Sequence, residues 1–143
     1  IYSVSGTSSS AMSAPGYVGS GRELTFTKQS ATSRVKVTYQ DTFGVQCSGQ
    51  IMQAIWHVRV DGNYVTNPHS LCGFYMVDTG ATYNNLFRPS AIVGYIDGLS
   101  AGQHTLSIYI TVHIVDGTYT LYTGGAAGGF NTSFLLEAEE IEI

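Results

Sequence analysis

Hydrophobic and polar residues alternate over short stretches of this chain. A period of two residues is typical of a β-strand with one buried and one exposed face. No stretch shows the apolar spacing of three and four residues that marks an amphipathic helix. Glycine, proline and asparagine separate the stretches at short intervals, as in sheets joined by turns. Strands are therefore predicted at residues 24–27, 35–40, 55–60, 71–77, 91–96, 104–115, 119–123 and 133–143.

Two Asp-Gly pairs mark turns beside these strands. Asp61 and Gly62 follow the stretch that places Trp56 on one face and His57 and Arg59 on the other. A second pair, residues 116–117, joins the longest alternating stretch to the next one. Because Asp-Gly favours tight turns between antiparallel strands, a hairpin is predicted there.

Eight to ten short strands without helices predict an all-β protein, built as an antiparallel β-sandwich or jelly roll. The apolar faces of the strands should meet between two sheets. The predicted core comprises Leu24, Phe26, Val35, Val37, Trp56, Val58, Leu106, Ile108, Ile110, Phe134 and Leu136.

The first 21 residues differ from the rest, because they are rich in serine and glycine and contain Pro15. Such a composition buries too little apolar surface to order a chain by itself. Residues 1–21 are therefore expected to be an extended or flexible segment, and residues 22–143 to form the sandwich domain.

Charged residues make up only 11% of the 143 residues, against roughly 25% in an ordinary soluble domain. A surface of hydroxyl and amide groups is typical of extracellular proteins, although close packing in an oligomer would also explain it. The net charge is −4, and four glutamates lie within the last seven residues. Without a basic patch the chain is not expected to bind nucleic acid. No apolar run is long enough for a transmembrane helix, so membrane insertion is not expected either.

From Trp56 onward, the order of several short motifs matches a known family. These motifs are Trp56-x-Val-x-Val-Asp-Gly62, Arg88-x-Ser90, Val93-Gly94-x-x-x-Gly98-Leu-x-Ala-Gly102, Thr123-Gly124, Asn131-x-Ser133 and the ending Leu-Leu-Glu-Ala-Glu-Glu140. In this the chain resembles the C-terminal globular domain of the collagen-triple-helix-repeat-containing secreted proteins. The resemblance implies a jelly roll like those of tumour necrosis factor and complement proteins, a homotrimer, and a secreted, extracellular-matrix role.

Candidate catalytic residues are few. Asp61, Asp97 and Asp116 each precede glycine, which turn chemistry explains. The histidines, His57, His69, His104 and His113, match no metal-ligand spacing. The nucleophile elbow of serine hydrolases is also missing. The chain is therefore expected to be a non-enzyme with no metal and no cofactor.

Two covalent modifications are predicted. Cys47 and Cys72 form a disulfide in one interpretation, and in the other both are buried free thiols. Asn131 begins an Asn-Thr-Ser sequence, which is the acceptor pattern for N-glycosylation in a secreted protein.

The sequence thus predicts a secreted, non-catalytic, trimeric β-jelly-roll module with extracellular protein or glycan partners. One alternative is a carbohydrate-binding lectin domain, since β-sandwiches often bind sugars through aromatic and amide side chains. Its ligand contacts would come from loops containing Asn63, Tyr64, Asn84 and Asn85. Another alternative is the head of a viral or phage fibre.

Overall fold

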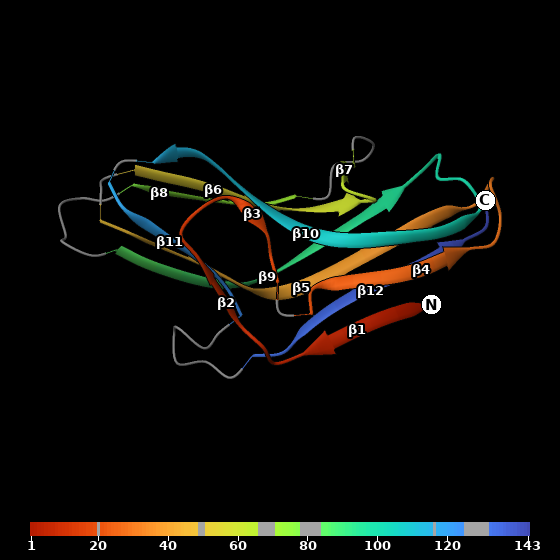
Figure 1. The fold of residues 1–143 in the computed structure, drawn as a ribbon, viewed down its shortest axis with the longest axis horizontal. Helices are drawn as coiled ribbons and strands as arrows, with labels where there is room; N and C mark the ends of the chain where they lie inside the picture. Colours follow the sequence, from red (N-terminus) through yellow and green to blue (C-terminus); the bar gives the residue numbers. More distant parts are fainter. Residues whose placement is uncertain (20, 49–50, 66–70, 78–83, 116, 125–131) are drawn as a thin grey trace.

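Two antiparallel β-sheets pack face to face in the computed structural model of the chain (Figure 1). The structure describes residues 1–143 except 20, 49–50, 66–70, 78–83, 116 and 125–131. The described residues form twelve strands and no helix, so the prediction of an all-β antiparallel sandwich is confirmed. No helix in this part of the chain is long and apolar enough to cross a membrane.

The first sheet, sheet A, is built around one long strand. β5 pairs with β9 along one edge, and with β12 and then β11 along the other. β1 extends the sheet beyond β12, and β2 extends it beyond β11. The strands are β1 (Tyr2–Gly6), β2 (Ser10–Met12), β5 (Arg34–Cys47), β9 (Asn84–Ile96), β11 (Tyr119–Thr123) and β12 (Phe134–Ile141).

The second sheet, sheet B, is built around two long strands, β6 and β10. β4 and β3 pair in succession with one edge of β10, and β6 pairs with its other edge. β8 and β7 then pair with β6. The strands are β3 (Gly16–Tyr17), β4 (Glu23–Lys28), β6 (Ile51–Val60), β7 (Asn63–Tyr64), β8 (Leu71–Val77) and β10 (Gly102–Val115).

The core lies between the sheets, and every residue predicted for it is buried. Trp56 is fully buried at the centre, with its ring centroid 5.2 Å from that of Phe43 in the opposite sheet. Its indole Nε1 donates to Thr123 Oγ1 at 3.0 Å, which satisfies its one polar atom inside the core. The two-residue period alone therefore identified the apolar faces correctly.

The structure differs from the prediction in where the sandwich begins. The segment 1–21 was expected to be extended or flexible and separate from the domain, but it contributes β1, β2 and β3, which pair with strands of both sheets. Val4 and Met12 pack against the core, and Val18 is buried in it. Backbone pairing at the sheet edges and these few apolar side chains order a segment of mostly polar composition. The three short strands, together with β7, also raise the strand number above the predicted eight to ten.

Of the two predictions made from Asp-Gly pairs, one is confirmed and the other is wrong. Asp61 and Gly62 have φ angles of 50° and 78°, as a tight turn between β6 and β7 requires. The hairpin predicted at residues 116–117 is wrong, because β10 belongs to sheet B whereas β11 pairs with β5 and β2 in sheet A. The chain therefore passes from sheet B at β10 to sheet A at β11.

A buried ion pair ties the N-terminal segment to the sandwich. Arg22, just before β4, donates from Nε to Asp41 Oδ2 at 2.5 Å, and both side chains are 1% exposed. Asp41 also accepts from the Tyr39 hydroxyl at 2.6 Å and from the Thr42 backbone at 2.8 Å. Arg22 Nη2 donates to the carbonyl of Ser8 at 2.7 Å. This network fixes the connection between β1 and β2 against the core.

Candidate functional site

The outer face of sheet B carries a cluster of aromatic and basic side chains. In β6, Trp56 and its alternate neighbours face the core, so His57 and Arg59 face outward. Tyr109 of β10 lies opposite His57 in the antiparallel register. Tyr17 of β3 lies opposite Tyr109 on the other side of β10.

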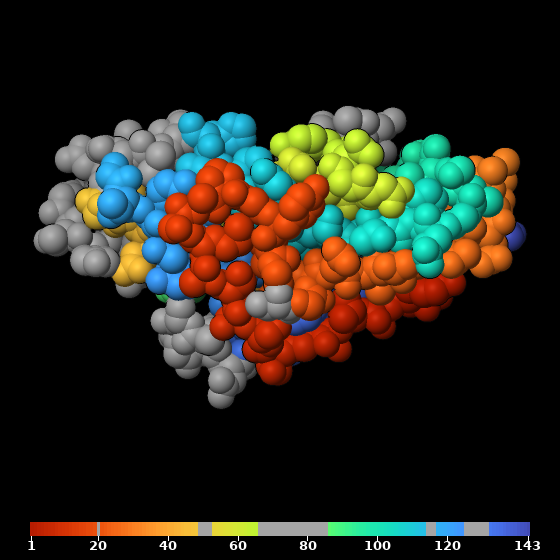
Figure 2. Space-filling model, in the orientation of Figure 1, coloured from red at the N-terminus to blue at the C-terminus, as the bar shows by residue number. Residues whose placement is uncertain are grey.

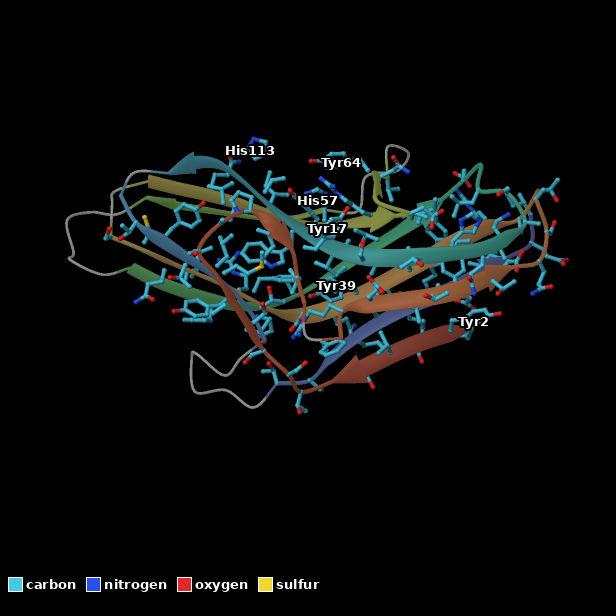
Figure 3. The ribbon with its side chains drawn as sticks, in the orientation of Figure 1. Tyr2, Tyr17, Tyr39, His57, Tyr64 and His113 are labelled. Atoms are coloured by element: carbon cyan, nitrogen blue, oxygen red, sulfur yellow. The ribbon has the colours of Figure 1, made fainter. Side chains whose placement is uncertain are left out.

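The turn at Asp61 and Gly62 brings β7 back along β6, so that Tyr64 lies opposite Arg59. Five residues from four strands thus meet on one face, and we call them the tyrosine–arginine surface: Tyr17, His57, Arg59, Tyr64 and Tyr109. Figure 3 shows Tyr17, His57 and Tyr64 close together on the sheet B side, whereas Tyr39 lies between the sheets. In Figure 2 the red segment that carries β3 lies directly beside the yellow-green segment that carries β7.

Arg59 lies at the centre of this surface. Its guanidinium carbon is 3.6 Å from the ring centroid of Tyr109, 4.2 Å from that of Tyr64 and 5.4 Å from that of Tyr17. These distances are typical of cation–π contacts. Nη1 donates to the Tyr17 hydroxyl at 3.3 Å. Burial acts to lower the pKa of Arg59, but the hydroxyls of Tyr17 and Tyr64 outweigh it and raise that pKa. The side chain therefore keeps its charge.

His57 lies beneath Tyr64, with the two rings stacked at 4.8 Å between centroids and 4° between planes. The residue is only 3% exposed, and neither ring nitrogen has a hydrogen-bond partner in the part of the chain that the structure describes. Burial lowers the pKa of His57 to about 4, assisted by the charges of Arg59 and His113. The imidazole is therefore neutral at pH 7.

A second histidine fixes the turn that positions Tyr64. His104 Nδ1 lies 2.7 Å from Asp61 Oδ2, and its Nε2 lies 3.0 Å from the carbonyl of Ser100. Since both ring nitrogens face acceptors, the hydrogen bond to Asp61 and then that to Ser100 raise the pKa of His104. Asp61 also accepts from the Thr105 backbone at 2.8 Å. Burial acts to raise the pKa of Asp61, but these hydrogen bonds outweigh it and lower that pKa.

A pocket of about 210 Å³ adjoins Tyr64, and we call it the β7 pocket. Asn63 and Tyr64 line one part of it, and Asp61 and Asp97 contribute carboxylates. Val60, Val65, Ile96 and Leu99 complete its lining. Tyr64 belongs to both features, so the pocket and the tyrosine–arginine surface adjoin at this residue.

A larger depression of about 560 Å³ lies on sheet A, around Gln40, Pro89 and Thr132. Its one carboxylate belongs to Asp41, which already binds Arg22. Among the described residues, no group of three or more histidine, cysteine, aspartate or glutamate side chains could hold a metal ion. The tyrosine–arginine surface is therefore the strongest candidate for recognition.

The structure brings together two of the four predicted ligand contacts, Asn63 and Tyr64. Asn84 and Asn85 lie instead in β9 of sheet A, opposite Cys47 and Gln46, and their side chains fall outside the described residues. β9 begins at the left of Figure 1, whereas β7 lies to the right. These two pairs of residues thus lie in strands of different sheets.

The predicted modifications remain predictions. Cys47 is buried in β5 of sheet A, and Cys72 lies in β8 of sheet B, but the side chain of Cys72 is outside the described residues. Asn131 also falls outside them.

Tyr17, Arg59 and Tyr109 were not predicted from the sequence as site residues. The alternation in β6 already placed His57 and Arg59 on an outward face, which was the available signal. The partner strands, and hence the rings around Arg59, depend on pairings between distant segments such as β3 with β10.

Comparison with known proteins places the chain in a family. The family model described as "CTHRC1, C-terminal domain" matches residues 10–136. The chain belongs to the CTHRC1 C-terminal domain family. This confirms the resemblance that the motifs from Trp56 onward indicated. No curated protein sequence matches the chain significantly.

The solved structures that the chain matches are distant from this CTHRC1-type domain. The EclA C-terminal domain, described as a sugar-binding protein, is 12% identical with a TM-score of 0.40, and the match covers 95% of this chain and 79% of that one. The carbohydrate-binding module CBM36, solved with calcium and xylotriose, is 16% identical with a TM-score of 0.39, and the match covers 97% and 100%. A family 35 module from Clostridium thermocellum is 18% identical with a TM-score of 0.24, and the match covers 85% and 90%.

Proposed function

We propose that this CTHRC1-type domain is a secreted, non-catalytic recognition module that assembles as a homotrimer in the extracellular space. The tyrosine–arginine surface is the single observation that carries the recognition role. Exposed tyrosines around an arginine are common at binding sites, because both side chains offer broad contact area and hydrogen bonds. Tyr17 and Tyr64 are 49% and 55% exposed, which leaves their rings available to a partner.

The outer face of sheet A supports the trimer. Phe87 and Tyr122 pack there with ring centroids 5.4 Å apart, and Val93 is 55% exposed further along β9. Gly44 makes room for the Phe87 ring, since a Cβ atom at Gly44 would lie 2.3 Å from Phe87 Cδ1. Apolar surface on a sheet face is typical of subunit interfaces. Recognition and assembly would then use opposite faces of the sandwich.

Light scattering on the purified chain tests the trimer. We expect a native mass of about three times the 15.3 kDa of one chain, with and without reductant. Val93→Asp should convert the trimer to monomers, because it would bury a carboxylate at an apolar interface. Thr25→Asp is the matched control on the outer face of sheet B, and it should remain trimeric. A monomeric wild-type chain at micromolar concentration would contradict the proposed assembly.

A lectin is the second candidate, and the β7 pocket favours it. Tyr64 offers an exposed aromatic ring at the edge of the pocket, and Asn63 offers an amide within it. Sugar sites commonly combine an aromatic platform with amide and carboxylate hydrogen bonds. Recognition of a protein partner alone would need no such pocket, so saturable binding of a saccharide would favour the lectin.

A further inference from the structure

We propose that the tyrosine–arginine surface and the β7 pocket together bind an acidic oligosaccharide in which a carboxylate-bearing sugar alternates with a neutral sugar. The carboxylate would lie on Arg59, and the adjacent neutral unit would lie against Tyr64 and enter the pocket. This inference rests on the recognition function proposed above and names its ligand class.

Arg59 supplies a positive charge with no carboxylate partner. The ion pairs in the described part of the chain use Arg22, Arg34, Lys36 and His104, and none includes Arg59. The Nε atom of Arg59 is buried and has no hydrogen-bond partner among the same residues. A guanidinium offers two parallel donors to a carboxylate, which makes arginine well suited to bind such a group.

His57 is the second unsatisfied group at this surface. Its two ring nitrogens are buried without hydrogen-bond partners among the described residues, directly beneath Tyr64. Leaving a buried polar group unpaired costs free energy, so this part of the surface is not optimised for the stability of the fold alone. Arg59 Nε and both ring nitrogens of His57 therefore lack hydrogen-bond partners among the described residues.

Tyr17 and Tyr64 favour a saccharide as the occupant. Their rings are about half exposed and lie on either side of Arg59, on the face of a sheet. The C–H face of a sugar ring packs on such aromatic surfaces, while its hydroxyls bond to tyrosine hydroxyls and amides. The Asn63 side chain is exposed beside them and can offer its amide oxygen.

The β7 pocket favours a neutral unit next to the charged one. Its carboxylates are already paired, Asp61 with His104 and Asp97 with Arg34 at 2.9 Å. The described lining contains no cation that could bind a second anionic group. The net charge of −4 also opposes a densely charged polyanion. A saccharide with one negative charge for every two sugars therefore matches a surface in which Arg59 lies beside a pocket without a cation.

Calorimetric titration of the full chain with three octasaccharides tests the proposal. Hyaluronan carries a carboxylate on alternate sugars, a chitin oligomer is neutral, and heparin is densely sulfated. We expect hyaluronan to bind at least about tenfold more tightly than the neutral oligomer, because one charged hydrogen-bonded contact is gained. We also expect heparin to bind with an affinity close to that of hyaluronan.

Variants of the surface sharpen the test. Arg59→Gln should weaken hyaluronan binding by about 10- to 100-fold, and Arg59→Lys by about tenfold because the paired donors are lost. Lys36→Gln is the matched control, since it removes one cation from the outer face of sheet A, and binding should change less than about twofold. Circular dichroism of each variant confirms that the fold is retained.

Several outcomes would overturn the proposal. Equal binding of the neutral oligomer, or hyaluronan binding that Arg59→Gln leaves unchanged, would refute the acidic ligand while a lectin remained. Binding of a sulfotyrosine peptide, lost in Arg59→Gln, with no saccharide bound would refute the ligand class but retain the recognition function. Failure of every saccharide and peptide to bind would refute both.

Discussion

Replacing Asp41 by asparagine should destabilise the fold by about 3–5 kcal/mol, because it leaves the Arg22 guanidinium buried without its counter-charge. Asp41 accepts from Arg22, Tyr39 and the Thr42 backbone, and the residue is 5% exposed. Burial raises the pKa of Tyr39, and the negative charge of Asp41 raises it further, so the phenol remains a donor. Urea unfolding of wild type and variant measures the difference.

An exposed ion pair provides the matched control for Asp41. Asp97 pairs with Arg34, but their side chains are 41% and 34% exposed. Asp97→Asn should therefore cost less than about 1 kcal/mol. Replacing both buried partners, Arg22→Met with Asp41→Leu, should recover part of the loss, since no uncompensated charge remains. A cost below about 1 kcal/mol for Asp41→Asn would show that the network does not stabilise the fold.

Acidification should weaken the fold through His57. The pKa of His57 is about 4 in the folded chain, against roughly 6.5 when unfolded. Between these values the unfolded chain binds a proton that the folded chain does not, so the free energy of unfolding falls as the pH falls. The loss should total about 3 kcal/mol by pH 4, and the full contribution is present above pH 6.5.

His57→Phe isolates this effect, since it keeps an aromatic ring against Tyr64 and removes the two unpartnered nitrogens. Its unfolding free energy should be flatter than that of wild type between pH 6.5 and 4.5. The other shifted groups are present in both proteins, so their effects cancel in the comparison. The raised pKa of His104 gives stability that is lost as the pH rises, and the lowered pKa values of Asp61 and Glu140 act at lower pH. Parallel pH profiles for the two proteins would exclude His57 as the cause.

Local sequence patterns were sufficient for the parts of the fold that depend on one strand at a time. The alternation in β6 identified Trp56 as core, and Asp61 with Gly62 identified a turn. Such patterns could not predict which strands pair when the segments lie far apart in the sequence. The Asp-Gly pair at residues 116–117 gives no indication that the next strand belongs to the other sheet. Likewise, the serine-rich composition of residues 1–21 gave no reason to predict Tyr17 as a site residue. It joins the site because β3 pairs with β10.

For the same reason, only part of the candidate site could be predicted from the sequence. Asn63 and Tyr64 follow a recognisable turn, and their amide and aromatic side chains indicated a ligand contact. The charge at the centre comes from Arg59, whose surroundings combine β3, β6, β7 and β10. Asn84 and Asn85 show the opposite case, since the same side-chain chemistry lies in a strand of the other sheet.

A glycan array probed with the wild-type chain and with the double variant Tyr17→Ala, Tyr64→Ala tests most directly whether the outer face of sheet B is a recognition surface. Both tyrosines are about half exposed, so the variant should keep its fold. We expect wild type to bind a subset of glycans saturably, with uronate-containing ones among them, and the variant to lose that binding. Absence of binding to every glycan, or binding that the variant retains, would contradict a glycan-recognition surface on this sheet.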